Sequence, residues 1–301
     1  MIHTPAPPQS RPALAAQSSA GRRAACLLLA LAASLSLFSL PSNCLAGQTA
    51  RGALTPLQRE IERERARLGA ADAEERRDAV QRLGAMRRPD AARAAASALR
   101  DPSEVIRATA AHAILAMPAD EAAALLVPLL ADKKEFVRRE TAYALGEAGS
   151  RAGVEALLAA LARDKEAGVR GAAAVALGRI GDERAVAALA EALGRRVAGT
   201  GFFSRITRSK TEENEFVRRA AAEALGRIGS RAGVPALVAT LADERAPDDV
   251  RRESARALAA IGDPAALPAL RAALTARDPY LARIAFDALR KLDPAHAAPP
   301  S

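Results

Sequence analysis

The chain has 301 residues and a formal net charge of +9; half of its residues are hydrophobic, 3% are aromatic and none is tryptophan. Acidic and basic residues are interleaved, whereas a nucleic-acid-binding protein gathers its basic residues on one face, so the charge argues against a nucleic-acid partner. Both cysteines, Cys26 and Cys44, lie near the N-terminus, which excludes disulfides, thiolate catalysis and cysteine-ligated zinc from the rest of the chain.

Residues 1–46 have the three parts of a secretory signal peptide. Two arginines form the charged start, residues 24–40 are an uncharged apolar run, and residues 44–46 place small side chains at both positions that a signal peptidase recognises. The apolar run is short for a membrane span, which needs about 20 residues. We therefore expect a periplasmic or secreted protein cleaved before Gly47. An uncleaved anchor in the inner membrane is the alternative, and it would be the only membrane contact.

Residues 47–71 predict a linker and a capping helix. Thr55 has the features of an N-cap, with proline at the first helical position and Gln58 three residues after the cap. The helix that follows has a narrow apolar stripe, and its other positions are charged. Such a helix suits the end of a stack of helices, because it covers one apolar face and presents a polar surface to water.

From residue 72 to 293 one unit recurs along the chain. Its clearest copy, from Phe136 to Leu161, has apolar residues at helical spacing in both halves and glycines between them, which predicts two helices joined by a turn. The steps between successive units are 31, 31, 32, 48, 33 and 31 residues. One helix pair cannot bury both apolar faces, so the period predicts a solenoid of stacked pairs. The units start at Glu75, Ile106, Val137, Val169, Val217, Val250 and Leu281.

Alignment of the units gives two columns that predict the core. The position four residues after each start is always small, and the position eight residues after it is always Leu or Ile. Alanine also dominates the composition, and alanine is the strongest helix former. We therefore expect an all-α structure without strands. The small column is Ala79, Ala110, Thr141, Ala173, Ala221, Ser254 and Ala285; the aliphatic column is Leu83, Ile114, Leu145, Leu177, Leu225, Leu258 and Leu289.

The repeated pattern V-R-(R/G)-x-(A/S/T)-A-x-A-L-(G/A), followed in the best copies by I-G-(D/S), resembles the HEAT repeat. The resemblance is to the short form found in phycobilin lyases and covers about residues 72–293. It implies a right-handed α-solenoid, or superhelix, of about seven helical hairpins, with the second helix of each pair on the concave side. It does not imply one activity, because this class of repeat serves mainly as a binding scaffold.

An arginine column follows the first residue of most units. It could form a basic stripe for an acidic partner. Alternatively, each arginine could pair with a carboxylate at the end of the preceding hairpin, such as Asp101, Asp132 or Asp164. Charged side chains in repeats are usually paired locally, which favours this ladder of ion pairs. The column consists of Arg76, Arg107, Arg138, Arg170, Arg218 and Arg251.

The residues after position 46 offer little for catalysis, which needs convergent polar groups. His112 lies in a column that also accepts Gln, Tyr, Val, Glu, Arg and Asp, which predicts a surface position, and His296 lies near the C-terminus. We find no metal-ligand spacing, no nucleophile with a nearby base and no phosphate-binding loop, and we assign the glycines to hairpin turns. We therefore expect no enzyme activity, catalytic residue, metal or cofactor.

One unit contains an insertion, residues 195–215, that accounts for the step of 48 residues. Insertions in repeat proteins form loops on one face, often the binding face. Adjacent aromatics flanked by arginines resemble an interface anchor with a polar rim. The alternative is that these aromatics fold back and shield the ridge of the solenoid. The candidate partner-binding residues are Arg195, Arg196, Phe202, Phe203, Arg205, Ile206 and Arg208.

These observations favour an exported, non-enzymatic scaffold that binds an unidentified protein through its concave face, the 195–215 loop, or both. A chromophore-handling protein of the bilin-lyase type is the first alternative, supported only by the repeat type and opposed by the leader and the shortage of aromatics. A nucleic-acid binder of the same repeat class is the second. Residues 294–301 contain three prolines and predict a disordered tail.

Overall fold

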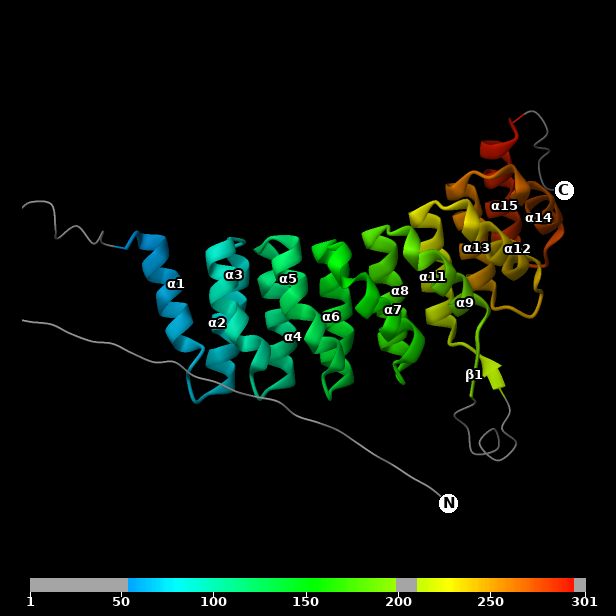
Figure 1. The fold of residues 1–301 in the computed structure, drawn as a ribbon. Helices are drawn as coiled ribbons and strands as arrows, with labels where there is room; N and C mark the ends of the chain where they lie inside the picture. Colours follow the sequence, from blue (N-terminus) through cyan, green and yellow to red (C-terminus); the bar gives the residue numbers. More distant parts are fainter. Residues whose placement is uncertain (1–53, 199–209, 295–301) are drawn as a thin grey trace, which may run out of the picture. The chain divides into compact units, whose positions relative to one another are not determined.

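The computed structural model describes residues 54–198 and 210–294. The predicted signal peptide or anchor, most of the predicted linker and residues 295–301 of the predicted tail lie outside the described residues. In the part that is described, no helix is long and apolar enough to cross a membrane. Helices form most of this part of the chain (Figure 1).

The helices alternate between two series, as the predicted all-α solenoid of helical pairs requires. Each first helix packs extensively on the next first helix, whereas from α5 onward each second helix packs mainly on the first helix of the next pair and less on other second helices. The first helices are α2 (Ala73–Ala85), α4 (Glu104–Ala113), α6 (Glu135–Ala148), α8 (Ala167–Ile180), α11 (Glu215–Ile228), α13 (Asp248–Ile261) and α15 (Pro279–Leu292). The second helices are α3 (Pro89–Ala95), α5 (Ala119–Leu126), α7 (Val154–Arg163), α9 (Val186–Gly194), α12 (Val234–Ala242) and α14 (Leu267–Ala272).

Short 3-10 segments extend or introduce several of these helices. Those that extend a helix are η1 (Ala96–Arg100), η2 (Ile114–Ala116), η3 (Val127–Ala131) and η8 (Ala273–Thr275). Those that introduce a second helix are η4 (Arg151–Gly153), η5 (Glu183–Ala185), η6 (Arg231–Gly233) and η7 (Pro264–Ala266). Pro128 lies in η3, and α5 ends two residues before it, because proline cannot donate the hydrogen bond that a longer α-helix needs.

The predicted capping helix is α1 (Pro56–Arg67), which contacts α2 and α3. Its predicted start is confirmed: the Thr55 hydroxyl accepts from the Gln58 N–H at 3.2 Å, and the Gln58 side chain accepts from the Thr55 N–H at 2.9 Å. Only Ile61 and Glu64 of this helix are buried. Most of α1 is therefore available to water, as the narrow apolar stripe predicted.

The turn inside each typical pair combines a left-handed glycine with a short polar side chain. Gly181 ends α8 at a φ of 71°, a conformation that other residues rarely adopt. The Asp182 carboxylate that follows accepts the N–H of Arg184 and so starts η5. The I-G-D sequence therefore specifies the direction change between the two helices of a pair.

Both predicted core columns are confirmed. The small residues of the first column are all fully buried, and the aliphatic residues of the second are at most 3% exposed. The Ser254 hydroxyl donates to the carbonyl oxygen of Val250 at 2.9 Å, which satisfies the polar atom inside the core. The small and the large column together fill the space between successive first helices.

The assignment of all glycines to turns is wrong for the glycines inside the first helices, most of which form one column. Gly146 lies inside α6, where an added Cβ would come within 2.6 Å of the Ala176 Cα of α8. Gly178 and Gly226 approach Ala224 and Ala257 in the same way. The glycines are needed because successive first helices touch there almost backbone to backbone. Sequence periodicity places these residues near a turn but does not reveal the contact.

The position of Gly146, Gly178 and Gly226 is not glycine in α15, where it is Arg290, an exposed residue. Four residues earlier, where the interior units have alanine, α15 has Phe286. The guanidinium of Arg283 lies over the Phe286 ring, 5.9 Å from its centroid. Bulky side chains thus occupy the face on which a further first helix would pack. The described residues contain six complete pairs and the first helix of a seventh.

The expectation of no strands is wrong within the insertion. Strands β1 (Arg196–Ala198) and β2 (Lys210–Glu212) pair antiparallel, with Arg196 opposite Glu212. Each strand has three residues, which is too short to produce an alternating pattern in the sequence. The two ends of the insertion must leave α9 and return to α11 side by side, and paired strands satisfy their backbone groups along that path.

Replacing Gly146 by alanine should destabilise the protein by about 1–3 kcal/mol, because the added methyl group overpacks the contact with α8. Helix propensity alone predicts the opposite, a gain of about 1 kcal/mol. Urea unfolding followed by circular dichroism distinguishes the two. Gly194→Ala is the matched control, since an added Cβ there meets nothing within 4 Å, and it should be neutral or stabilising. Equal stability of G146A and the parent would contradict the close approach.

Candidate functional site

A ladder of buried ion pairs runs along the N-terminal ends of the first helices. In one rung, Nε and Nη2 of Arg138 donate to the two carboxylate oxygens of Asp164 at 2.7 and 2.9 Å. The two side chains are only 8% and 9% exposed. The remaining Nη1 donates to the backbone carbonyl oxygen of Asp132 at 3.0 Å. One guanidinium thus joins two successive loops.

The geometry repeats in three more rungs. Each arginine binds both oxygens of one carboxylate, and its Nη1 donates to carbonyl oxygens in the loop before its own helix. The rungs are Arg76 with Asp101 at 2.7 and 3.1 Å, Arg107 with Asp132 at 2.8 and 2.9 Å, and Arg170 with Glu213 at 3.0 and 2.6 Å. We call these three pairs, together with Arg138 and Asp164, the arginine ladder.

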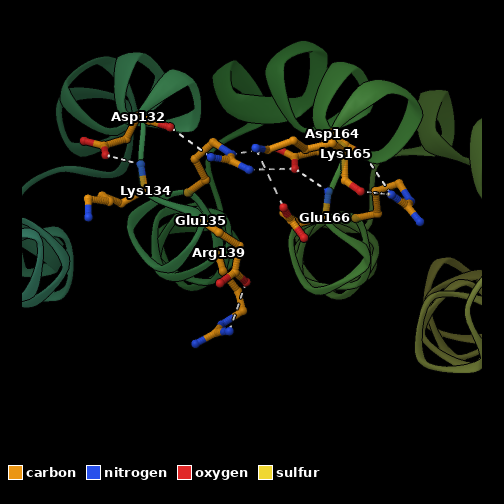
Figure 2. Close-up of polar contacts among 9 residues, drawn as sticks. Asp132, Lys134, Glu135, Arg139, Asp164, Lys165 and Glu166 are labelled. Carbon is orange, nitrogen blue, oxygen red and sulfur yellow. Dashed lines mark hydrogen bonds and ion pairs between the residues drawn. The ribbon is translucent and has the colours of Figure 1, made fainter. Parts of the chain in front are cut away.

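Each carboxylate of the ladder also helps to begin the next first helix. Asp132 accepts the N–H of Lys134 at 2.8 Å, and Asp164 accepts that of Glu166 at 2.9 Å. Figure 2 shows the two aspartates in neighbouring loops, each linked to the residue two places further on. Bidentate arginine–carboxylate pairs fix geometry as well as charge. A rung therefore sets where the next helix begins relative to the previous one.

The predicted ladder is confirmed in kind, but its partners were assigned to the wrong hairpin. Arg107 does not pair with the Asp101 carboxylate of the preceding hairpin; it pairs with Asp132, at the end of its own hairpin. The loop that precedes it contributes only carbonyl oxygens. The reason is that helical side chains lean toward the N-terminus of their helix, where the loops before and after a pair lie side by side.

The ladder stabilises the ionised form of its three aspartates. Burial raises the pKa of Asp164, but hydrogen bonds from Arg138 and from the Glu166 N–H lower it further, so that it lies below its ordinary value. The same balance lowers the pKa of Asp101 and Asp132. The hydrogen bonds from arginine and backbone N–H groups therefore outweigh the cost of burying these aspartates.

The fourth rung forms the base of the insertion. Glu213 replaces the usual aspartate, and its side chain is completely buried. Its carboxylate binds Arg170, accepts the N–H of Asn214 at 2.8 Å and lies 3.9 Å from Nη1 of Arg195. Arg195 also donates to the carbonyl oxygen of Leu161 at 3.1 Å, at the C-terminal end of α7. Both ends of the insertion are therefore fixed to the solenoid.

The structure places two of the seven predicted partner-binding residues. Arg195 is 15% exposed and is used within the base of the insertion rather than on a rim. Arg196 lies in β1, and only its backbone is described. The other five, Phe202, Phe203, Arg205, Ile206 and Arg208, lie outside the described residues.

The surface of the second helices carries two hollows that sequence analysis missed. One, of 390 Å³, lies between η3 and α7 and includes Pro128, Ala159 and Arg163. The other, of 240 Å³, lies between α9 and α12 beside the base of the insertion, and includes Arg195 and Ala239. Alanines leave these spaces open because their side chains are short. The break at Pro128 was the one signal in the sequence that pointed to the first hollow.

The ladder changes after the insertion. Nε of Arg218 donates to the carbonyl oxygen of Leu193 at 2.9 Å, and Nε of Arg251 donates to that of Leu241 at 3.1 Å. Each of these carbonyls lies near the C-terminal end of a second helix, where a cation is favourable. The next residue, Arg252, binds Asp278 through both carboxylate oxygens at 2.6 and 2.8 Å.

His112 lies at the surface, as predicted, with its side chain 37% exposed. Its Nε2 is 3.3 Å from a carboxylate oxygen of Glu140, and its Nδ1 is 3.5 Å from one of Glu147. The two ring nitrogens thus face different carboxylates and do not converge on one point. Among residues 54–198 and 210–294, no group of three or more His, Cys, Asp or Glu side chains is placed to hold a metal ion.

Comparison with known proteins agrees with the repeat pattern. A family model described as HEAT repeats matches three times, at residues 64–146, 125–199 and 205–290. No curated protein sequence matches the chain.

Among solved structures, the chain is similar to human deoxyhypusine hydroxylase in complex with glycerol, with 23% identity over 78% of this chain and 96% of that one, and a TM-score of 0.38. It is similar to the CpcE–CpcF complex of phycocyanin lyase from Nostoc sp. PCC7120, with 23% identity, 86% and 93% coverage and a TM-score of 0.46. A designed armadillo repeat protein in complex with the peptide (KR)4 matches with 19% identity, 78% and 100% coverage and a TM-score of 0.42. These similarities carry no information about activity or partner.

Replacing Asp164 by asparagine should destabilise the protein by about 3 kcal/mol, because the buried guanidinium of Arg138 loses its counter-charge. Urea unfolding measures the change. Asp287→Asn is the matched control: it removes a carboxylate from an exposed pair with Arg283 on α15 and should change stability little. Similar losses in both variants would contradict a special role of the ladder.

Acid should weaken the ladder. The aspartate pKa values are lower in the folded than in the unfolded chain, so this stabilisation is complete above the ordinary pKa of 3.8 and is lost as the pH falls through the lower folded-state values. The melting temperature should therefore fall steeply below about pH 4, and D164N should show a shallower fall. Parallel curves for the two proteins would contradict the assignment.

Proposed function

The chain belongs to the HEAT repeat family, and from that premise we propose that it is an exported, non-enzymatic scaffold that binds another protein. The observation that carries the proposal is the surface of the second helices, where two hollows lie on either side of α7 and α9 and one of them adjoins the fixed base of the insertion. The small side chains of this surface allow a partner to approach the helices closely.

Support for binding rather than catalysis comes from how the charged groups are used. The three aspartates of the ladder are held by arginines and backbone N–H groups, and their pKa values are lowered rather than raised toward neutrality. A general acid or base works best with a pKa near the working pH. The ladder therefore supports a structural use of these groups, and the hollows support recognition by shape.

Support for export comes from the sequence alone. Residues 1–46 combine a charged start, an apolar run and a small-residue cleavage motif. The proposal predicts a mature protein that begins at Gly47 and is recovered from the periplasm or the medium. N-terminal sequencing of the protein from fractionated cells tests this, and an intact N-terminus in the membrane fraction would favour the anchored form.

The second-helix surface and the insertion make separate contributions to binding in this proposal. The hollow between η3 and α7 lies well away from the insertion in sequence, whereas the hollow between α9 and α12 is lined by Arg195 at its base. A partner that fills both would contact four successive second-helix segments. The family resemblance assigns these helices to the concave side, which favours an elongated partner segment.

Crosslinking pull-down of the full chain from its own cells should recover a protein partner, and Ala159→Arg should reduce that recovery at least tenfold by filling the hollow beside α7. Ala260→Arg is the matched control, since Ala260 is also exposed but lies on the first helix α13. Equal loss in both variants, or none in A159R, would remove the second-helix surface from the proposal. Deletion of residues 199–209 tests the insertion separately, and unchanged recovery would remove the insertion.

A further inference from the structure

Arg251 belongs to the arginine column that supplies the ladder, but its side chain has no carboxylate partner among the described residues. In the rungs before the insertion, the carboxylate lies 25 or 26 residues after the arginine. The residue 25 places after Arg251 is Ala276. Among the described residues, the Arg251 side chain makes no ion pair, and its one hydrogen bond joins Nε to the carbonyl oxygen of Leu241.

The backbone at Ala276 has the conformation that the ladder uses for its carboxylates. Ala276 follows the 3-10 segment η8 with φ −62° and ψ 145°. Asp101 follows η1 with φ −59° and ψ 144°, and Asp132 follows η3 with φ −59° and ψ 146°. The backbone of this loop is therefore built as in an intact rung, with alanine at the position of the carboxylate.

A cavity of 510 Å³ opens at this place. Arg251, Thr275 and Arg277 line it, together with the Asp278 that Arg252 already binds. Glu244 and Asp248 lie on its rim and are exposed. Arg251 and Arg277 thus share this cavity with the carboxylates of Glu244 and Asp248. Because both signs of charge are present, the cavity does not suit a purely anionic ligand.

We propose that this cavity binds an aspartate followed by lysines on a partner protein. The aspartate takes the place that Ala276 leaves empty, where it binds the Nη groups of Arg251. The lysines that follow it pair with Glu244 and Asp248 on the rim. The inference deepens the proposed function by naming the chemistry of one contact, and it depends on that function only for its biological use.

The chain itself contains a segment of this type. In the rung of Arg107, the carboxylate comes from Asp132, which is followed by Lys133 and Lys134. Bidentate arginine–carboxylate pairing is the strong part of such a contact, and the lysines add orientation. The sequence that fills an intact rung from within the chain is therefore a suitable probe for the empty one.

The test titrates the ¹⁵N-labelled full chain with the blocked peptide ADKK, the sequence of residues 131–134, and follows the arginine Nε–H signals by NMR. The Nε–H signal of Arg251 is identified as the one that disappears in the R251Q variant. This signal should shift as peptide is added, with a dissociation constant of the peptide on the order of 1 mM. The same peptide with asparagine in place of aspartate should bind at least tenfold more weakly. R256Q is the control on the same helix and should bind as the parent does.

The decisive variant is Ala276→Asp, which supplies the carboxylate from within the chain. It should raise the melting temperature and abolish the peptide-induced shift. Binding that survives in A276D, equal binding of the asparagine peptide, or no shift up to 10 mM peptide, about ten times the expected dissociation constant, would overturn the proposal. Equal binding of the peptide ADAA would overturn the assignment of Glu244 and Asp248.

The proposed function and this inference can fail separately. A chain that recovers no partner from its cells but binds ADKK through Arg251 would refute the scaffold proposal and leave the site. If the parent chain and the R251Q variant recover the partner equally well, and the parent does not bind ADKK, the site is refuted and the scaffold proposal stands.

Discussion

The arginine ladder is the constraint on which the spacing of the repeats depends. A buried charge pair gains little net stability over apolar packing, because removing two charges from water is costly, but breaking one is strongly destabilising. Each rung therefore works as a register mark: a hairpin of the wrong length would leave an arginine such as Arg138 buried without its carboxylate. The same rung holds the N–H groups that begin the next first helix. Repeat length, helix start and helix stacking are thus set by one interaction.

The insertion shows how the ladder tolerates a change of length. Glu213 lies 43 residues after Arg170 instead of 25 or 26, yet it reaches the same guanidinium geometry as the shorter rungs. The added residues are accommodated here because the carboxylate of Glu213 still reaches the guanidinium of Arg170. The paired strands β1 and β2 bring the chain back to that point, and Arg195 joins the base from the other side. A loop can therefore be carried without disturbing the stacking of α8 on α11.

Sequence periodicity predicted what is the same in every unit and missed what joins one unit to the next. The two core columns follow from helical spacing and were predicted residue by residue. The ladder was predicted as paired charges, but its direction was not, because the lean of an arginine side chain toward a neighbouring loop is a three-dimensional fact. Gly146 was misplaced for the same reason, since its contact with Ala176 lies in another unit. The empty position at Ala276 became visible only when its backbone could be compared with that of Asp101 and Asp132.

This division has a consequence for recognition. A surface that repeats identically along a solenoid offers a partner many equivalent positions and no single register. A partner that binds in a single register must therefore contact the positions where the repeat is irregular. These are the break at Pro128, the insertion with its base at Arg195, and Arg251, which lacks a carboxylate partner. These departures lie in three different parts of the described chain, and each changes either the shape or the charge of an otherwise regular array. Under the proposed scaffold function, binding should accordingly be more sensitive to changes at these irregular positions than at any regular column of the repeat that faces water.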